Sequence, residues 1–189
     1  MTLPVTMIER EYPSFSTMIR QLFKLMGSTA LSMHHAATGI AGECSELAGA
    51  NSRKNIIEES SDLEFYIEAL KQQFEFDLAG AFIGAQIITD SRANNIHLGN
   101  VFSNIQSLGG DILDQSKKVW VYSKPLDAAT MARMLLILEK NLEFVYELIG
   151  TDRASVIHFN QIKLIGPGGR FESGFYSDSA AIARADKVE

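Results

Sequence analysis

The segment NIIEESSDLEFYIEAL, residues 55–70, carries the pattern that decides the fold. Its apolar residues recur at the spacing of one face of an α-helix, and the pattern continues a few residues beyond the segment. The expected buried face consists of Ile56, Leu63, Tyr66, Leu70 and Phe74. We therefore predict a helix over about 55–76.

Helical spacing extends along most of the chain. All four prolines lie at the edges of periodic segments, and no alternating pattern is long enough to build a sheet. The chain is therefore predicted to be all-α. Further helices are expected from Ser14 onward, over about 30–53, 97–119 and 126–150, after Thr151-Asp152, and over 180–187. Residues 91–95, SRANN, are predicted to form a turn.

An internal repeat divides these helices into two similar halves. DLEFYIEAL at 62–70 matches NLEFVYELI at 141–149, and ELAGANSRK at 46–54 matches DILDQSKK at 111–118. The second half has a longer connection at 119–132. We predict two tandem helical hairpins that form a four-helix-bundle core. Chance similarity between amphipathic helices is the alternative.

Four carboxylates fall on helix faces that should be buried. Glu59 lies within the apolar stripe of the 55–76 helix, and Asp62 follows at its edge. In the preceding helix Glu43 lies among apolar residues, and Glu46 follows three positions later. Each helix of the first hairpin therefore points an acidic pair toward the same interior.

Burying these carboxylates together is costly unless they are protonated, paired with bases or bound to a cation. Few basic residues share this face, and ligands that are all oxygen favour a hard divalent ion, Mg²⁺ or Mn²⁺. A single E-x-x-E on a solvated helix needs no metal, but two acidic pairs on consecutive helices favour one. A ferritin-like di-iron site requires Glu-x-x-His pairs, and no histidine here has a glutamate three residues before it. The predicted metal ligands are Glu43, Glu46, Glu59 and Asp62.

The second half lacks most of this acidic set. The positions that match the four acids are occupied by Leu108, Asp111, Leu138 and Asn141. Only Asp111 is acidic. We therefore predict one functional site per chain. The predicted organisation is a single all-α domain, 1–189, with a metal-binding hairpin at 28–76, a degenerate hairpin at 96–150 and a tail at 151–189.

The composition of the chain disfavours nucleic-acid binding and membrane insertion. Seventeen basic against twenty-three acidic residues give a net charge of -6, which disfavours binding to a nucleic-acid backbone. No segment has the apolar length of a membrane helix, and the N-terminus does not resemble a signal peptide, so no membrane partner is expected. The single cysteine, Cys44, cannot form an internal disulfide and is expected to be a buried packing residue. We expect a cytoplasmic protein.

The motif GIAGECSELAG at 39–49, followed by the 55–70 segment, resembles the MazG-type all-α nucleoside triphosphate pyrophosphohydrolases, most closely the form common in phage genomes. NQIKL at 160–164, Arg170 and FYSDSAAIARADK at 175–187 resemble the ending of that group. The resemblance implies that the two acidic pairs hold Mg²⁺ or Mn²⁺ and that a (d)NTP is hydrolysed to the monophosphate and pyrophosphate. It favours purine deoxynucleotides such as dGTP, because some members supply dGMP for diaminopurine-containing DNA. A phage-encoded enzyme would act in the host cytoplasm.

Many members of this family carry E-E-x-x-E, in which the additional glutamate is implicated as the base that activates water. Gly42 occupies this position here, so Glu58 or a metal-bound hydroxide is the predicted base. Cations are expected to contact the phosphates, and an aromatic side chain is expected to stack on the nucleobase. The candidate substrate contacts are Lys117, Lys118, Trp120, Tyr122, Lys124, Asn160, Lys163, Arg170 and Tyr176.

Other functions stay open at this point. A dUTPase or a phosphoribosyl-ATP pyrophosphohydrolase would use related chemistry on a narrower substrate. A helical interaction module would show no turnover at all. Because the chain contains both hairpins, it need not dimerise to complete a site, although it could form a homo-oligomer.

Overall fold

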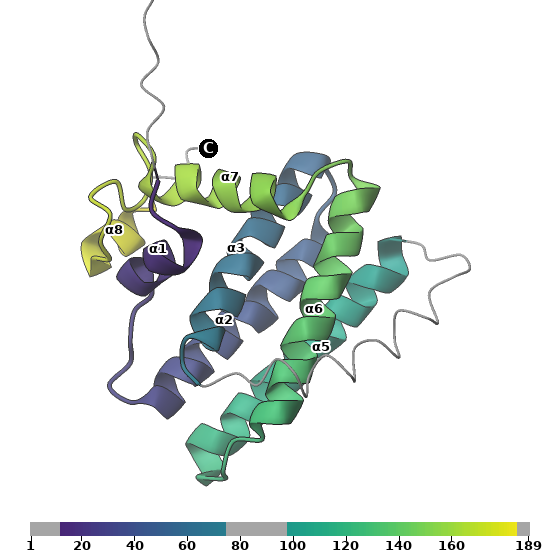
Figure 1. Cartoon of the computed structure of the whole chain (residues 1–189), viewed down its shortest axis with the longest axis vertical. Helices are drawn as coiled ribbons and strands as arrows, with labels where there is room; N and C mark the ends of the chain where they lie inside the picture. The colour runs from purple at the N-terminus through teal and green to yellow at the C-terminus, as the bar shows by residue number, and fades with distance from the viewer. Residues whose placement is uncertain (1–11, 75–97, 185–189) are drawn as a thin grey trace, which may run out of the picture.

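The computed structural model describes residues 12–74 and 98–184, and within these ranges every regular element is an α-helix (Figure 1). The prediction of an all-α fold is therefore confirmed. The helices are α1 (Phe15–Leu22), α2 (Thr29–Gly49), α3 (Arg53–Lys71), α5 (Leu98–Tyr122), α6 (Ala128–Leu148), α7 (Arg153–Ile165) and α8 (Asp178–Ala183). The turn predicted at 91–95 lies outside the described residues.

Most of these helices begin directly after a serine or aspartate. The side chain of that residue accepts a hydrogen bond from a backbone N–H of the first turn, which has no acceptor within the helix. The capping residues are Ser14, Ser28, Ser52, Asp127, Asp152 and Ser177. The helix starts predicted at Ser14 and at Thr151-Asp152 are confirmed.

Three predicted boundaries are wrong. The helix predicted over 180–187 is α8, which begins at Asp178 after the Ser177 cap and ends at Ala183, because Arg184 adopts a left-handed backbone conformation. The helix predicted over 30–53 ends at Gly49, and α3 begins at Arg53 because Ser52 caps it. The longer connection predicted at 119–132 is mostly helical, since α5 continues to Tyr122 and α6 begins directly after Asp127. Only residues 123–127 connect the two helices.

The four long helices supply most of the buried core, to which α1 and α7 also contribute. α2 and α3 make one hairpin, α5 and α6 make a second, and α2 packs against both α3 and α5 (Figure 1). The similar segments 62–70 and 141–149 lie in the second helix of each hairpin. Both hairpins are therefore present, and the first places its two acidic pairs on facing helices.

The second hairpin has a conventional packed face where the first has acids. Leu138 and Asn141 are both buried. The amide Nδ2 of Asn141 donates to the carbonyl of Ile137 in the same helix, at 2.7 Å. Its polar group is satisfied locally and needs no cation.

α7 runs across α3 and is held there by a buried carboxylate. Glu64 of α3 is 1% exposed. Its Oε1 accepts hydrogen bonds from Arg153 Nε at 2.9 Å and from the Tyr146 hydroxyl at 3.1 Å, and its Oε2 accepts from Arg153 Nη2 at 2.8 Å. Beyond α7 the chain folds back, and the Tyr176 N–H donates to the carbonyl of Gln21 at 3.2 Å. This contact brings the tail against the end of α1.

α5 approaches α2 closely at Gly109. A Cβ atom at Gly109 would lie 2.9 Å from Cys44 Sγ and 3.3 Å from the Cα of Ala41. Cys44 is fully buried there, as predicted, and burial raises the pKa of its thiol to about 12. Further along, Ser116 Oγ lies 3.0 Å from His34 Nδ1, so α5 runs antiparallel to α2.

This contact predicts opposite effects for alanine at two adjacent positions. Gly109→Ala would force the helices apart, whereas Gly110→Ala meets no atom within 4 Å and gains helix propensity. We expect the Gly109 variant to be less stable than the Gly110 variant by roughly 2 kcal/mol. Urea unfolding followed by circular dichroism would measure the difference. Equal stabilities would contradict the close α2–α5 packing.

Candidate functional site

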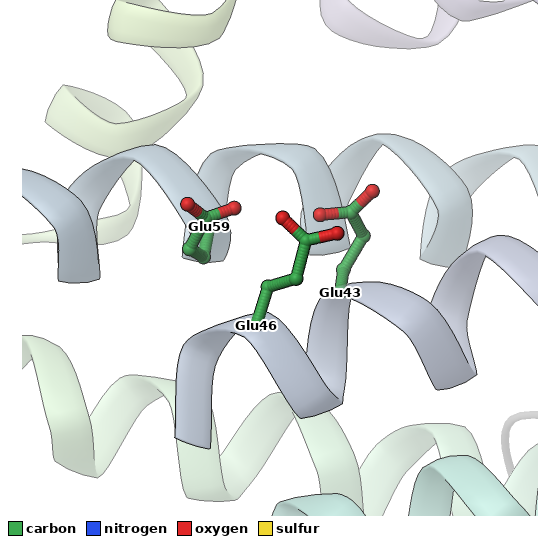
Figure 2. A group of neighbouring side chains, drawn as sticks. All are labelled: Glu43, Glu46 and Glu59. Carbon is green, nitrogen blue, oxygen red and sulfur yellow. The ribbon is translucent and has the colours of Figure 1, made fainter. Parts of the chain in front are cut away.

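Three glutamates from the first hairpin meet between its helices. Glu43 and Glu46 project from α2 and Glu59 from α3, and Figure 2 shows their carboxylates turned toward one another. One carboxylate oxygen of each lies within 4.8 Å of the other two. The short link between α2 and α3 brings the two helices face to face at this level. The predicted convergence of these three acids is therefore observed.

The cluster is electrostatically unfavourable without a cation. Burial raises the pKa of Glu43 to about 8, and repulsion from Asp62, Glu46 and Glu59 adds to this effect. Lys163 acts in the opposite direction and does not cancel the shift. The arrangement thus favours either protonation or a bound cation, as the sequence suggested.

Asp62, the fourth predicted ligand, is held by α7. Its Oδ2 lies 2.6 Å from Lys163 Nζ, and its Oδ1 accepts a hydrogen bond from Asn160 Nδ2 at 3.1 Å. The side chain of Lys163 is only 6% exposed. Burial disfavours its charged form, but attraction to Asp62 and Glu58 is stronger and raises its pKa. Both carboxylate oxygens of Asp62 thus contact α7, while its charge repels that of Glu43.

Glu58, the predicted base, lies on the same side as Asp62. Its Oε1 is 3.3 Å from Lys163 Nζ. Glu58 is not among the residues that line the pocket beside the cluster. We therefore do not assign it the role of base.

A pocket of about 410 Å³ opens beside the acids. Glu43, Glu46 and Asp62 form one part of its wall, and α1, α2, α3 and the tail enclose it. The other polar and aromatic residues of the wall are Phe23, Lys24, His35, Phe65, Tyr66, Arg170, Phe171, Tyr176 and Arg184. The pocket thus combines carboxylates, cations and aromatic surfaces.

The structure brings the predicted tail contacts to the acids. Asn160 and Lys163 touch Asp62, and Arg170 and Tyr176 line the pocket. They arrive there because α7 crosses α3 and the following segment returns to α1.

The contacts predicted on α5 lie elsewhere. None of them lines this pocket, because α5 is antiparallel to α2 and its end lies beside the start of α2. There Trp120 stacks on His34 with ring centroids 4.8 Å apart, and Lys118 pairs with Asp114 at 2.7 Å. These predicted contacts are Lys117, Lys118, Trp120 and Tyr122 of α5 and Lys124 of the link that follows it.

Sequence reasoning missed several residues of the pocket wall. Tyr66 was assigned only to the apolar stripe, yet its ring also faces the pocket. Lys24, His35 and Arg184 come from separate parts of the chain, and no local pattern connects them. Only the path of the tail brings Arg184 near the end of α1.

The comparisons with known proteins identify no relative: no family model, curated protein or solved structure matches the chain. Among the described helices, none is both long and apolar enough to cross a membrane.

The raised pKa of Glu43 predicts a pH-dependent effect of Glu43→Gln on metal-free protein. Folding raises this pKa from 4.5 to about 8. The folded state therefore holds the proton more tightly than the unfolded state, and the stability that depends on this proton is fully present below about pH 4.5 and is lost as the pH rises through about 8. In EDTA the variant should therefore gain thermal stability over the wild type between pH 5 and pH 8.5. Glu147→Gln, which removes an exposed carboxylate of α6, serves as the control. A difference for Glu43→Gln that stays constant with pH would contradict the shift.

Proposed function

We propose that this protein hydrolyses a nucleoside triphosphate to the monophosphate and pyrophosphate with the help of a divalent cation. The observation that carries the proposal is the cluster of Glu43, Glu46 and Glu59 at the edge of a pocket with a cationic rim. The MazG-like spacing of the acidic pairs supports the same activity.

The residues present fit a hard divalent ion. Their donors are carboxylate oxygens on two facing helices, which suits Mg²⁺ or Mn²⁺. The strongly raised pKa of Glu43 reflects a negative charge that such an ion would offset. Glu43, Glu46 and Glu59 would hold it. When bound, the ion would neutralise phosphate charge and acidify a water molecule.

The cations of the rim suit the phosphates. Lys24, Arg170 and Arg184 line the pocket together with the acids. Since the chain carries a net charge of -6, a polyanion needs such local positive groups in order to bind. Arginine and lysine would hold the phosphate oxygens through charge-assisted hydrogen bonds. Their role is to position the triphosphate beside the acids.

The aromatic walls suit a nucleobase. Phe65, Tyr66 and Phe171 line the same pocket. Burial raises the pKa of the Tyr66 hydroxyl to about 12, so Tyr66 presents a neutral ring and a hydrogen-bond donor. A flat heterocycle could stack on these surfaces while its phosphates face the acids.

Pyrophosphate release tests this function directly. The substrates are the common ribo- and deoxyribonucleoside triphosphates, with dUTP and phosphoribosyl-ATP, each with Mg²⁺ and with Mn²⁺. We expect turnover, with dGTP among the better substrates, and a loss of about a hundredfold or more in Glu59→Gln because the cation loses a ligand. Glu147→Gln is the matched control and should keep full activity.

Two outcomes would contradict the proposal. The first is no release from any substrate, with the fold intact, which would favour an interaction module. The second is release that Glu59→Gln leaves unchanged, since the hydrolysis would then take place elsewhere. Activity confined to dUTP or to phosphoribosyl-ATP would support the proposed reaction but show that the substrate is not a common nucleoside triphosphate.

A further inference from the structure

The contacts of Asp62 set it apart from the three clustered glutamates. Glu43, Glu46 and Glu59 have oxygens within 4.8 Å of one another, and this group does not include Asp62. Asp62 instead contacts Lys163 at 2.6 Å and Asn160 at 3.1 Å, both from α7. The four acids therefore divide into a group of three and one that is bonded to another helix.

Lys163 is a buried cation that lies between two carboxylates. Its side chain is 6% exposed, and its Nζ lies between Asp62 Oδ2 at 2.6 Å and Glu58 Oε1 at 3.3 Å. A buried ammonium with two carboxylate partners is held in its charged form. A divalent ion at the same place would be repelled by this charge.

We propose that the Lys163 ammonium takes the place of a second divalent cation at Asp62. The site then binds one divalent ion, through Glu43, Glu46 and Glu59, and the fourth acid stays paired with α7. This inference rests on the proposed function only in that the cluster takes a divalent ion. It departs from the expectation that all four acids are ligands.

The position of Asn160 supports this assignment. Asn160 is fully buried, and its Nδ2 donates to both Asp62 Oδ1 and, at 3.3 Å, Ser61 Oγ. An amide donor aimed at a carboxylate oxygen competes with a metal ion for the same lone pairs. Lys163 and Asn160 together orient Asp62 toward α7.

The number of Mn²⁺ ions that bind to each chain in the absence of nucleotide tests this inference. Calorimetry, with the free ion followed by electron paramagnetic resonance, should give one Mn²⁺ per chain in the wild type. Lys163→Met removes the positive charge that lies between Asp62 and Glu58, so a second Mn²⁺ should bind there. Lys140→Met, which removes an ammonium paired with Glu143 on α6, is the control and should stay at one. Two ions in the wild type, or one in a folded Lys163→Met protein, would overturn the inference.

A second pair of variants does not depend on the folding of Lys163→Met. Asp62→Asn removes a neighbouring charge but no ligand, so it should lower the Mn²⁺ affinity far less than Glu59→Gln, which should lower it by about tenfold or more. If Asp62→Asn lowers the affinity as much as Glu59→Gln does, Asp62 is a ligand and the inference is wrong. A wild-type chain that binds one Mn²⁺ but releases no pyrophosphate would contradict the proposed function alone.

Discussion

The rest of the site depends on the ion pairs between α3 and α7. Arg153 near the start of α7 pairs with Glu64, and Lys163 near its end pairs with Asp62. Glu64 is 1% exposed, so loss of its Arg153 partner would leave a buried charge uncompensated. The two contacts fix both ends of α7 against one helix of the acidic hairpin. They also determine where the chain emerges to form the tail.

The tail completes the pocket because α7 ends in a tight turn. A Cβ atom at Gly166 would lie 2.4 Å from the carbonyl oxygen of Ile162, so a residue with a side chain would not fit there. The Phe171 N–H then donates to the carbonyl of Leu164, and the Tyr176 N–H donates to Gln21. Arg170 and Arg184 therefore reach the rim through the way α7 is held and ends, whereas Lys24 comes from the segment after α1.

The predictions about the first hairpin succeeded where local periodicity was sufficient. Glu43 and Glu59 lie on the apolar sides of consecutive helices joined by a short link and are partly buried, so periodicity is sufficient to predict that they meet. Glu46 joins them but is exposed, so the expectation of a buried face is wrong for it. The same reasoning could not separate Asp62 from them, since its partners Asn160 and Lys163 come from a helix about a hundred residues away. The contacts expected on α5 lie outside the pocket for a related reason: α5 packs antiparallel to α2, through long-range contacts at Gly109 and Ser116 that no local pattern reveals.

The sequence by itself determined the all-α fold, the two helical hairpins and the convergence of three glutamates. These features depend on helical periodicity and short connections, which act over a few turns. Only the tertiary structure decided which cations accompany the acids and which aromatic residues enclose the pocket. Lys24, Arg170 and Arg184 converge through the crossing of α7 and the return of the tail, and burial and long-range ion pairing control both. No periodic pattern within a single helix encodes contacts of that range.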